Sequence, residues 1–153
     1  MFNVILILQL LVSTGMVALT ALAHLAGLAV LIGLLQTHGA RLRTPHVRLD
    51  QALLLLVAVF SLFVLHGVEI WLYAAVYVGV GEFRSFEDAL YFSTSTYATI
   101  GYGDLVLSRA WRIVGAIEGV NGIILLGWST AFFVSIVRRL ADLERVEFRP
   151  RDG

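Results

Sequence analysis

Three long apolar stretches alternate with polar segments along the chain. The stretches cover residues 2–35, 52–80 and 113–137. About 20 apolar residues are enough for a helix to cross the hydrocarbon core of a bilayer, so each stretch predicts one membrane-spanning helix. The first stretch exceeds this length, and we expect its helix to tilt or to continue beyond the hydrocarbon.

The borders of these stretches carry their own signals. Residues 38–50 are mostly polar and predict a loop, because Pro45 ends any continuous helix. Near the end of the second stretch, Trp71 is followed by Tyr73 and Tyr77. Aromatic rings collect at the membrane–water interface, so these side chains predict a hydrocarbon boundary near Trp71.

The segment between the second and third stretches predicts a short helix that enters the membrane. Ser85 is a favourable N-cap, and Glu87 and Asp88 suit a first helical turn. The helical pattern continues for about 12 residues to Tyr97, which is roughly 18 Å. Such a helix cannot cross a bilayer, and the irregular backbone after it is allowed at membrane depth only where protein or water surrounds it. We therefore expect a re-entrant helix.

Composition agrees with an integral membrane protein of one domain. Of the 153 residues, 59% are apolar and 14% are charged, against about 25% charged in a typical soluble domain. Eleven arginines balance eleven acidic residues, without any lysine. This neutral charge excludes the basic field that nucleic-acid binding requires. The absence of cysteine excludes disulfides and thiolate metal sites.

The arginines predict the orientation. Positively charged residues near membrane spans collect on the cytoplasmic side. We therefore expect a multi-pass protein of the plasma (inner) membrane, with the N-terminus outside, the C-terminus cytoplasmic and the re-entrant helix entering from outside. The arginines concerned lie in the loop and the tail, at Arg41, Arg43, Arg48, Arg138, Arg139, Arg145, Arg149 and Arg151.

The most informative motif is T-I-G-Y-G-D at residues 99–104. In a strand, successive carbonyls point to opposite sides. Glycine adopts positive φ at little steric cost, so Gly101 and Gly103 allow successive carbonyls to point the same way. Four such segments around an axis would form rings of oxygens that replace the water around K⁺, as in potassium channel filters. A glycine-rich surface turn is disfavoured, since such a turn needs neither an entering helix nor paired spans.

The segments Ala-Leu-Tyr-Phe-Ser (residues 89–93) and 96–104 resemble the pore helix and filter of the potassium channel family. The flanking apolar stretches resemble its outer and inner pore helices, so the resemblance covers about residues 50–139. It implies an all-α membrane protein with three transmembrane helices per subunit and a re-entrant pore helix and filter between the second and third. The chain then divides into an N-terminal peripheral helix (1–37), a cytoplasmic loop (38–49), a pore domain (50–139) and a short cytoplasmic tail (140–153).

The resemblance also implies a function. Each chain supplies one filter strand, so a homotetramer would conduct K⁺ passively across the lipid bilayer, without catalysis and without a cofactor other than the permeant ion. A weakly selective cation channel remains open, as does a non-conducting regulatory subunit. A potassium transporter subunit with four degenerate filter loops is disfavoured by the single complete motif. The residues that would coordinate K⁺, the only metal expected, are Thr99, Ile100, Gly101, Tyr102 and Gly103.

Further roles follow from the same resemblance. Asp104 would brace the filter behind its outer mouth, and Gly122 would be the hinge of the inner helix or a position of close helix packing. Ser95 stands where some members carry a glutamate that bonds this aspartate, so Asp104 needs another partner, for which we expect Tyr91. Ala98 replaces a second threonine found in many members. The residues expected to line the cavity below the filter are Ile123, Leu126, Thr130 and Val134.

Ionisable residues inside the predicted spans also require partners, because they are costly at membrane depth. His66 and Glu69 lie three residues apart on one helix face, and Glu118 lies at a similar depth in the third span. We expect all three to support the filter from behind, near the hydroxyl groups of the pore helix. A static hydrogen-bonded network is favoured over a pH sensor, because buried polar groups are usually satisfied structurally.

A metal site at His66 and Glu69 is disfavoured, because the sequence offers only two ligands there. His24 stands alone in the first span, and we expect it to be buried or at the lipid interface rather than functional.

Overall fold

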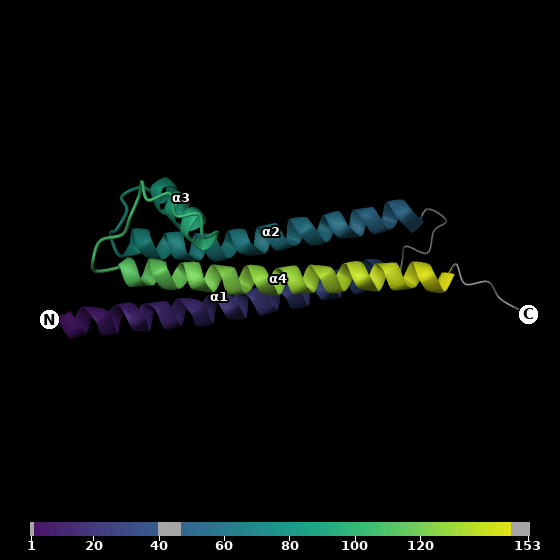
Figure 1. Cartoon of the computed structure of the whole chain (residues 1–153), viewed down its shortest axis with the longest axis horizontal. Coiled ribbons are helices and arrows are strands. Elements are labelled where there is room, and N and C mark those ends of the chain that lie inside the picture. Colours follow the sequence, from purple (N-terminus) through teal and green to yellow (C-terminus); the bar gives the residue numbers. More distant parts are fainter. Residues whose placement is uncertain (1, 40–46, 148–153) are drawn as a thin grey trace, which may run out of the picture.

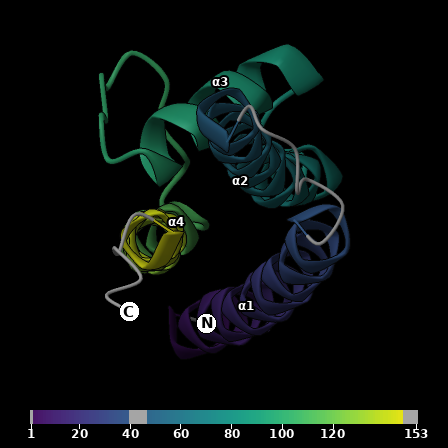
Figure 2. The same cartoon turned by 90° about the vertical axis from the view of Figure 1, so that its right-hand side faces the viewer.

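The computed structural model describes residues 2–39 and 47–147, and it places four α-helices and no strand in them. The helices are α1 (Phe2–Gly39), α2 (Val47–Gly79), α3 (Phe86–Tyr97) and α4 (Arg112–Glu147). The three long helices run side by side, and the short α3 lies against α2 and α4 at one end (Figures 1 and 2). The predicted all-α fold, with a short helix between the second and third long ones, is confirmed.

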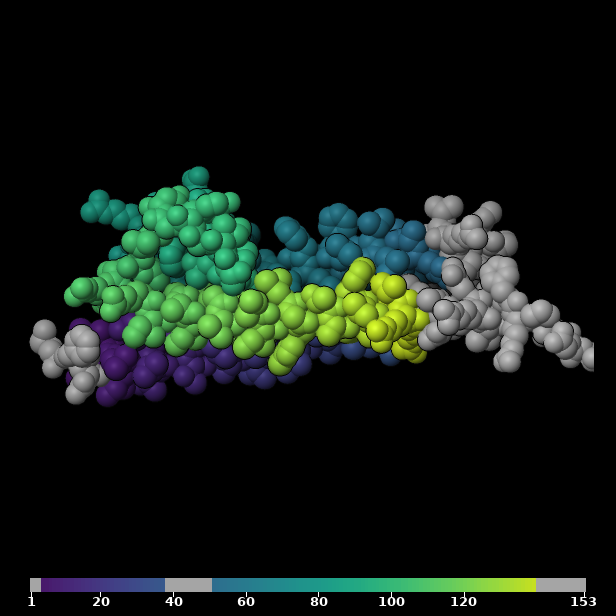
Figure 3. Space-filling model, in the orientation of Figure 1, coloured from purple at the N-terminus to yellow at the C-terminus, as the bar shows by residue number. Residues whose placement is uncertain are grey.

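Within the part of the chain that the structure describes, three helices are long and apolar enough to cross a membrane. The candidate spans are Val4–Thr37, Gln51–Gly79 and Arg112–Arg139. Their outer surfaces carry large exposed apolar side chains such as Leu11 and Phe63, as expected where lipid covers the protein. Figure 3 shows the long bundle that these helices form, with α3 and the loop beside it raised at one end. The chain is a multi-pass membrane protein.

The helices run beyond the predicted spans. α1 ends at Gly39, and α2 begins at Val47, inside the expected loop. α4 continues to Glu147 through residues expected to form a tail. Apolar patterning marks the hydrocarbon layer, whereas helical hydrogen bonding continues wherever good helix formers such as Arg, Leu and Glu follow. Pro45 and the loop arginines before it lie outside the described residues.

The buried face of α1 is mostly polar. This is the reverse of a soluble amphipathic helix, whose buried face is apolar. The buried positions of α1 recur every three, four or seven residues, which defines one helical face. Four of the six are polar, and the hydroxyls of Ser13 and Thr20 donate to carbonyls one turn earlier in α1. The buried residues are Gln9, Ser13, Met16, Thr20, His24 and Leu31. We call this face the polar stripe of α1.

The aromatic residues of α2 differ from their predicted placement. Trp71 is 59% exposed and contacts Phe86 edge-on, whereas Tyr73 and Tyr77 are fully buried in the protein. The hydroxyl of Tyr73 accepts a hydrogen bond from Asn121, 3.3 Å away. The two tyrosines therefore belong to the protein core, and only Trp71 fits the predicted interfacial position.

Small residues let α4 approach α3 closely. A methyl group added to Gly122 would lie 2.3 Å from the carbonyl oxygen of Tyr97, and one added to Gly119 would lie 3.4 Å from that of Thr96. Close backbone approach at small residues is a common means of helix association in membranes. These glycines fix the depth at which the C-terminal end of α3 meets α4.

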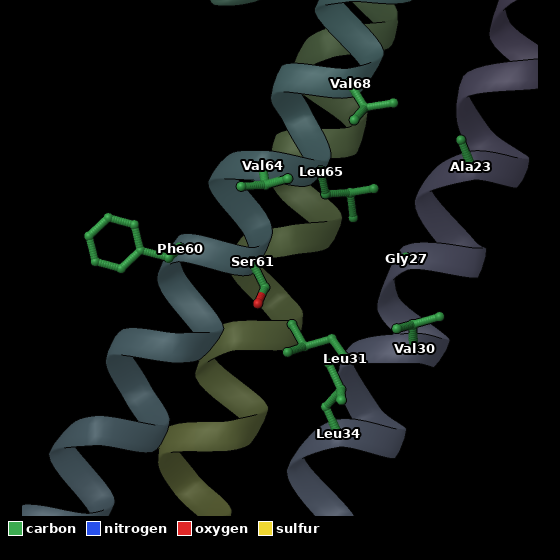
Figure 4. A pocket seen from close by; sticks show the side chains of 10 residues that line it. All are labelled: Ala23, Gly27, Val30, Leu31, Leu34, Phe60, Ser61, Val64, Leu65 and Val68. Atoms are coloured by element: carbon green, nitrogen blue, oxygen red, sulfur yellow. The ribbon is translucent and has the colours of Figure 1, made fainter.

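A groove lies between the C-terminal half of α1 and the middle of α2. It has a volume of about 480 Å³, and Figure 4 shows that its walls come from these two helices. Among its lining residues only Ser61 carries a polar side chain, so the groove offers little to orient a polar ligand. The lining consists of Ala23, Gly27, Val30, Leu31, Leu34, Phe60, Ser61, Val64, Leu65 and Val68.

Candidate functional site

α3 begins and ends as its sequence predicts. The side chain of Ser85 accepts hydrogen bonds from the backbone amides of Glu87 at 3.0 Å and Asp88 at 3.4 Å. These contacts satisfy two of the amide groups that a helix start leaves unpaired. The helix ends at Tyr97, and its partly negative C-terminal end directly precedes the T-I-G-Y-G-D segment.

The backbone of the T-I-G-Y-G-D segment alternates in conformation. Thr99, Gly101 and Gly103 have φ angles of +59°, +58° and +79°. Thr99 is the one non-glycine residue with positive φ among the described residues, a conformation that costs roughly 1–2 kcal/mol for an L-residue. The alternation is the backbone geometry that lets successive carbonyls point to one side.

The end of α3 holds this segment through its amide groups. The amides of Ile100 and Gly101 both donate to the carbonyl of Ser95, at 2.8 and 3.2 Å. The amide of Thr99 donates to the carbonyl of Thr96 at 2.9 Å. No hydrogen bond among the described residues ends on the carbonyls of residues 99–103. Five consecutive carbonyl oxygens are thus left available to an external partner.

The hydrogen bond expected between Tyr91 and Asp104 is present. The Tyr91 hydroxyl donates to Oδ2 of Asp104 at 2.8 Å, and the ring of Tyr91 stacks on that of Tyr102. This hydrogen bond lowers the pKa of Asp104 and raises the pKa of Tyr91. Ser95 instead accepts a long hydrogen bond from the amide of Tyr102, at 3.4 Å.

A second contact holds the loop that follows the segment. Glu82, just after α2, accepts from both the amide and the hydroxyl of Ser108, each at 2.7 Å. Together with the hydrogen bond from Tyr91 to Asp104, it fastens residues 104–108 to α3 and to the loop between α2 and α3.

The predicted polar cluster is two separate clusters. Glu118 of α4 accepts from the hydroxyls of Tyr77 at 2.6 Å and Ser93 at 2.5 Å. All of its polar atoms are buried, and Ser93 also contacts the carbonyl of Ile70 in α2. This group joins α2, α3 and α4. No hydrogen bond among the described residues connects it with His66 or Glu69.

The second cluster is centred on Glu69. Its carboxylate lies 2.8 Å from Nδ1 of His24 and 3.0 Å from Nδ1 of His66, and it accepts from the hydroxyl of Tyr97. The opposite nitrogen of His66 lies 2.9 Å from the hydroxyl of Ser129. His24, Glu69 and Tyr97 are all at most 1% exposed. The cluster joins all four helices at the C-terminal end of α3.

From the sequence, His24 is expected to be buried or at the lipid interface, and the sequence alone indicates no partner for it. The available signal was its spacing from other polar residues of α1, since Thr20 and Ser13 lie on the same helical face. Thr20 accepts from Asn121 at 2.8 Å, so a second polar contact ties α1 to α4.

The residues expected to line a cavity lie on an exposed face of α4. Ile123 is 58% exposed, and Leu126, Thr130 and Val134 are also exposed in the single chain. Gly122, on a neighbouring face, packs against Tyr97. A hollow of about 390 Å³ lies between the filter segment and α4. It is lined by Thr96, Thr99, Gly101, Gly115, Ala116, Gly119, Val120 and Ile123.

Comparison with known proteins adds one finding. Neither a curated protein nor a solved structure matches the chain. A family model described as an ion channel matches residues 53–139, which include most of α2, the whole of α3 with the filter segment, and the membrane-spanning part of α4. Because this match covers more than half of the chain, the protein belongs to that ion channel family.

Proposed function

We propose that the chain is one subunit of a homotetrameric potassium channel, which conducts K⁺ passively through rings of carbonyl oxygens from residues 99–103. The observation that carries this proposal is the backbone of that segment. Positive φ angles alternate at Thr99, Gly101 and Gly103, and no described residue hydrogen-bonds to the carbonyls between them. Stacked carbonyl rings of this kind replace the hydration shell of K⁺ in potassium channels.

The exposure of the filter supports assembly of several copies. Ile100 and Tyr102 are 53% and 68% exposed in the single chain, although they belong to a segment held firmly by α3. One chain contributes one side of a ring, and four chains around an axis close it. The exposed face of α4 from Ile123 to Val134 would then border the axis below the filter.

The position of α3 supports cation conduction. Its C-terminal end carries a partial negative charge and immediately precedes Thr99, so it favours a cation near the inner end of the filter. The N-terminal end of α1 and the start of α3 lie at the same end of the molecule (Figure 1). With the arginine-rich tail in the cytoplasm, α3 would enter from outside in the plasma membrane.

The decisive experiment is ion flux through the purified full-length protein in liposomes. We expect K⁺ and Rb⁺ to pass, Na⁺ to be excluded and Ba²⁺ to block. Native mass spectrometry of the same preparation should give four chains per particle. Equal Na⁺ and K⁺ flux would indicate a weakly selective cation channel instead, and no flux under any pH or membrane tension would favour a regulatory subunit.

The chain offers a matched pair of glycine variants. Gly103 and Gly81 have φ angles of +79° and +80°, and a methyl group added to either would meet no atom within 4 Å. Gly103→Ala and Gly81→Ala therefore strain the backbone equally, by about 1 kcal/mol or more. Only the first should abolish K⁺ flux, since only Gly103 lies in the proposed ion pathway. Equal loss of flux in both variants would contradict the proposed pathway.

A further inference from the structure

The cluster around Glu69 contains a third potential metal ligand, which the sequence alone did not bring together with the other two. His24 of α1 joins His66 and Glu69 of α2, and one potential ligand atom from each lies within 4.8 Å of the others. Two imidazoles and one carboxylate are a common ligand set for zinc. The three side chains come from two helices that approach one another only in the folded bundle.

The electrostatics of the cluster call for a cation. Glu69 is fully buried in a membrane-spanning helix, where an uncompensated carboxylate is costly. No arginine of the described residues forms an ion pair with it; its contacts there are the imidazoles of His24 and His66 and the hydroxyl of Tyr97. A metal ion held by the two imidazoles would compensate this carboxylate.

The outer contacts of the cluster suit metal ligation. Ser129 Oγ lies 2.9 Å from Nε2 of His66 and 3.5 Å from Nε2 of His24. If this oxygen accepts from both Nε2–H groups, both Nδ1 lone pairs face the carboxylate of Glu69. A metal ion between them would accept both lone pairs, in place of the contact that Nδ1 of His66 makes with the hydroxyl of Tyr97 at 3.0 Å. Hydrogen bonds from outer residues to the second nitrogen of a ligating histidine are the usual support of such sites.

We propose that His24, His66 and Glu69 form a site for a divalent transition-metal ion of the Zn²⁺ class, which clamps the peripheral helix α1 to α2 beside the end of the pore helix. In a tetrahedral site with bonds of about 2.0–2.1 Å, ligand atoms lie about 3.3 Å apart. The two histidine–carboxylate distances are 2.8 and 3.0 Å, each to a different carboxylate oxygen, and the three ligand atoms lie within 4.8 Å of one another, so side-chain adjustment brings them to this spacing. Mg²⁺ and Ca²⁺ fit poorly, because they require six or more oxygen ligands.

The proposed metal site lies next to the last residue of α3. Tyr97 donates to Glu69 and is the last residue of α3, two positions before Thr99. A metal ion held by Glu69 therefore fixes the residue from which the filter segment departs. The clamp itself is a binding and stability property, and it stands whether or not the channel conducts K⁺.

The test uses the full-length protein, purified in detergent without a histidine tag and treated with a chelator. His46 lies outside the described residues, and His38 is near the end of α1, so both are replaced with glutamine in the background. Zn²⁺ is titrated by calorimetry, and Co²⁺ is titrated by its visible absorption, which distinguishes tetrahedral from octahedral coordination. We expect one ion per chain and a tetrahedral Co²⁺ spectrum.

Single variants assign the ligands. His24→Gln and His66→Gln keep a hydrogen-bonding side chain but remove an imidazole, and each should weaken Zn²⁺ binding by about 100-fold or more, since even outer partners of a metal site contribute about 10–100-fold. Glu118→Gln is the matched control for Glu69→Gln. Its carboxylate is equally buried but bonds only to Tyr77 and Ser93 among the described residues, so this control should bind Zn²⁺ as the background does.

Two results would overturn the proposal. One is a background protein that binds neither Zn²⁺ nor Co²⁺, a measurement that needs no ligand variant and so is unaffected if a variant fails to fold. The other is equal Zn²⁺ affinity in folded His24→Gln and in the background. A Zn²⁺-dependent rise in the melting temperature that disappears in His66→Gln would support the clamp independently.

Discussion

The hydroxyl of Tyr91 donates to Oδ2 of Asp104 across 2.8 Å and thereby joins the middle of α3 to the far end of the T-I-G-Y-G-D segment. The amides of Ile100 and Gly101 hold the near end to Ser95. The segment is thus fastened to α3 at both ends, with its carbonyls left unpaired between the two attachments. Four predictions follow from contacts of this kind.

The first prediction concerns acid sensitivity. The Tyr91 hydrogen bond holds the pKa of Asp104 below its usual range, so the stabilisation it gives is complete above the ordinary value of about 3.9 and is lost as the pH falls through the lower folded value. Tyr91→Phe removes this hydrogen bond and raises the pKa of Asp104. The acid loss of K⁺ flux should therefore begin at a higher pH in this variant.

Glu82→Gln is the control for that measurement. Glu82 is another carboxylate at the same end of the molecule, but it bonds to Ser108 rather than to the filter segment. Its replacement should leave the acid midpoint of flux unchanged. If Tyr91→Phe also leaves the midpoint unchanged, the hydrogen bond to Asp104 does not support conduction.

The second prediction separates close packing from a hinge at Gly122. Gly122→Ala places a methyl group 2.3 Å from the carbonyl oxygen of Tyr97, and overpacking of this kind costs about 1–3 kcal/mol. Gly127→Ala meets no atom within 4 Å on the same helix and gains helix propensity of up to about 1 kcal/mol. Thermal unfolding in detergent should show a lower melting temperature only for Gly122→Ala. Equal melting temperatures would leave the hinge as the better explanation of this glycine.

The third prediction concerns Glu118. Its two carboxylate oxygens accept from two buried hydroxyls, whereas a glutamine there has a single acceptor oxygen. Glu118→Gln should therefore destabilise the protein by about 1–3 kcal/mol. Because the network is closed within the protein, the pH dependence of K⁺ flux between about pH 5 and pH 8 should match that of the unchanged protein. A pH response that disappears in Glu118→Gln would instead identify a proton sensor.

The fourth prediction concerns the attachment of α1. Thr20→Val removes the oxygen that accepts from Asn121 at 2.8 Å. Hydrogen bonds between membrane helices contribute about 0.6 kcal/mol on average and up to about 1.7 kcal/mol, so a loss in this range is expected in denaturant unfolding. Thr14→Val is the matched control, because Thr14 lies on the exposed side of α1. Similar losses in both variants would show that the contact to Asn121 contributes nothing specific.

Local signals predicted α3 well. A serine N-cap, two acidic residues and a short helical pattern define Phe86–Tyr97, and the structure has the same bounds. The Tyr91–Asp104 contact could also be predicted from the sequence, because the two residues lie close together along the chain. The ends of the long helices were harder to predict. Hydropathy indicates where a helix lies in the membrane, but it does not indicate how far helical hydrogen bonding continues, as it does in α4 to Glu147.

Contacts between distant helices could not be predicted from the sequence. His24 and Glu69 are 45 residues apart, and their meeting depends on the rotation of α1 against α2. The same holds for Glu118. Its predicted depth in the membrane suggested that it lies near His66, but the two side chains belong to separate clusters. The position of a residue along a span indicates its depth in the membrane. Which side of a helix faces another helix depends on how the two helices pack together.

The polar stripe of α1 has a consequence for the order in which the protein assembles. The chain is synthesised from its N-terminus, so α1 enters the bilayer before its partners exist. Gln9 and Thr20 therefore lack their hydrogen-bond donors until α4 is made, because these donors are the amide of Ile113 and the side chain of Asn121. A nascent chain released before α4 is made would keep this stripe open to lipid. Polar groups exposed in that way associate with other polar helices, so the packing of α4 against α1 protects this stripe from unwanted partners.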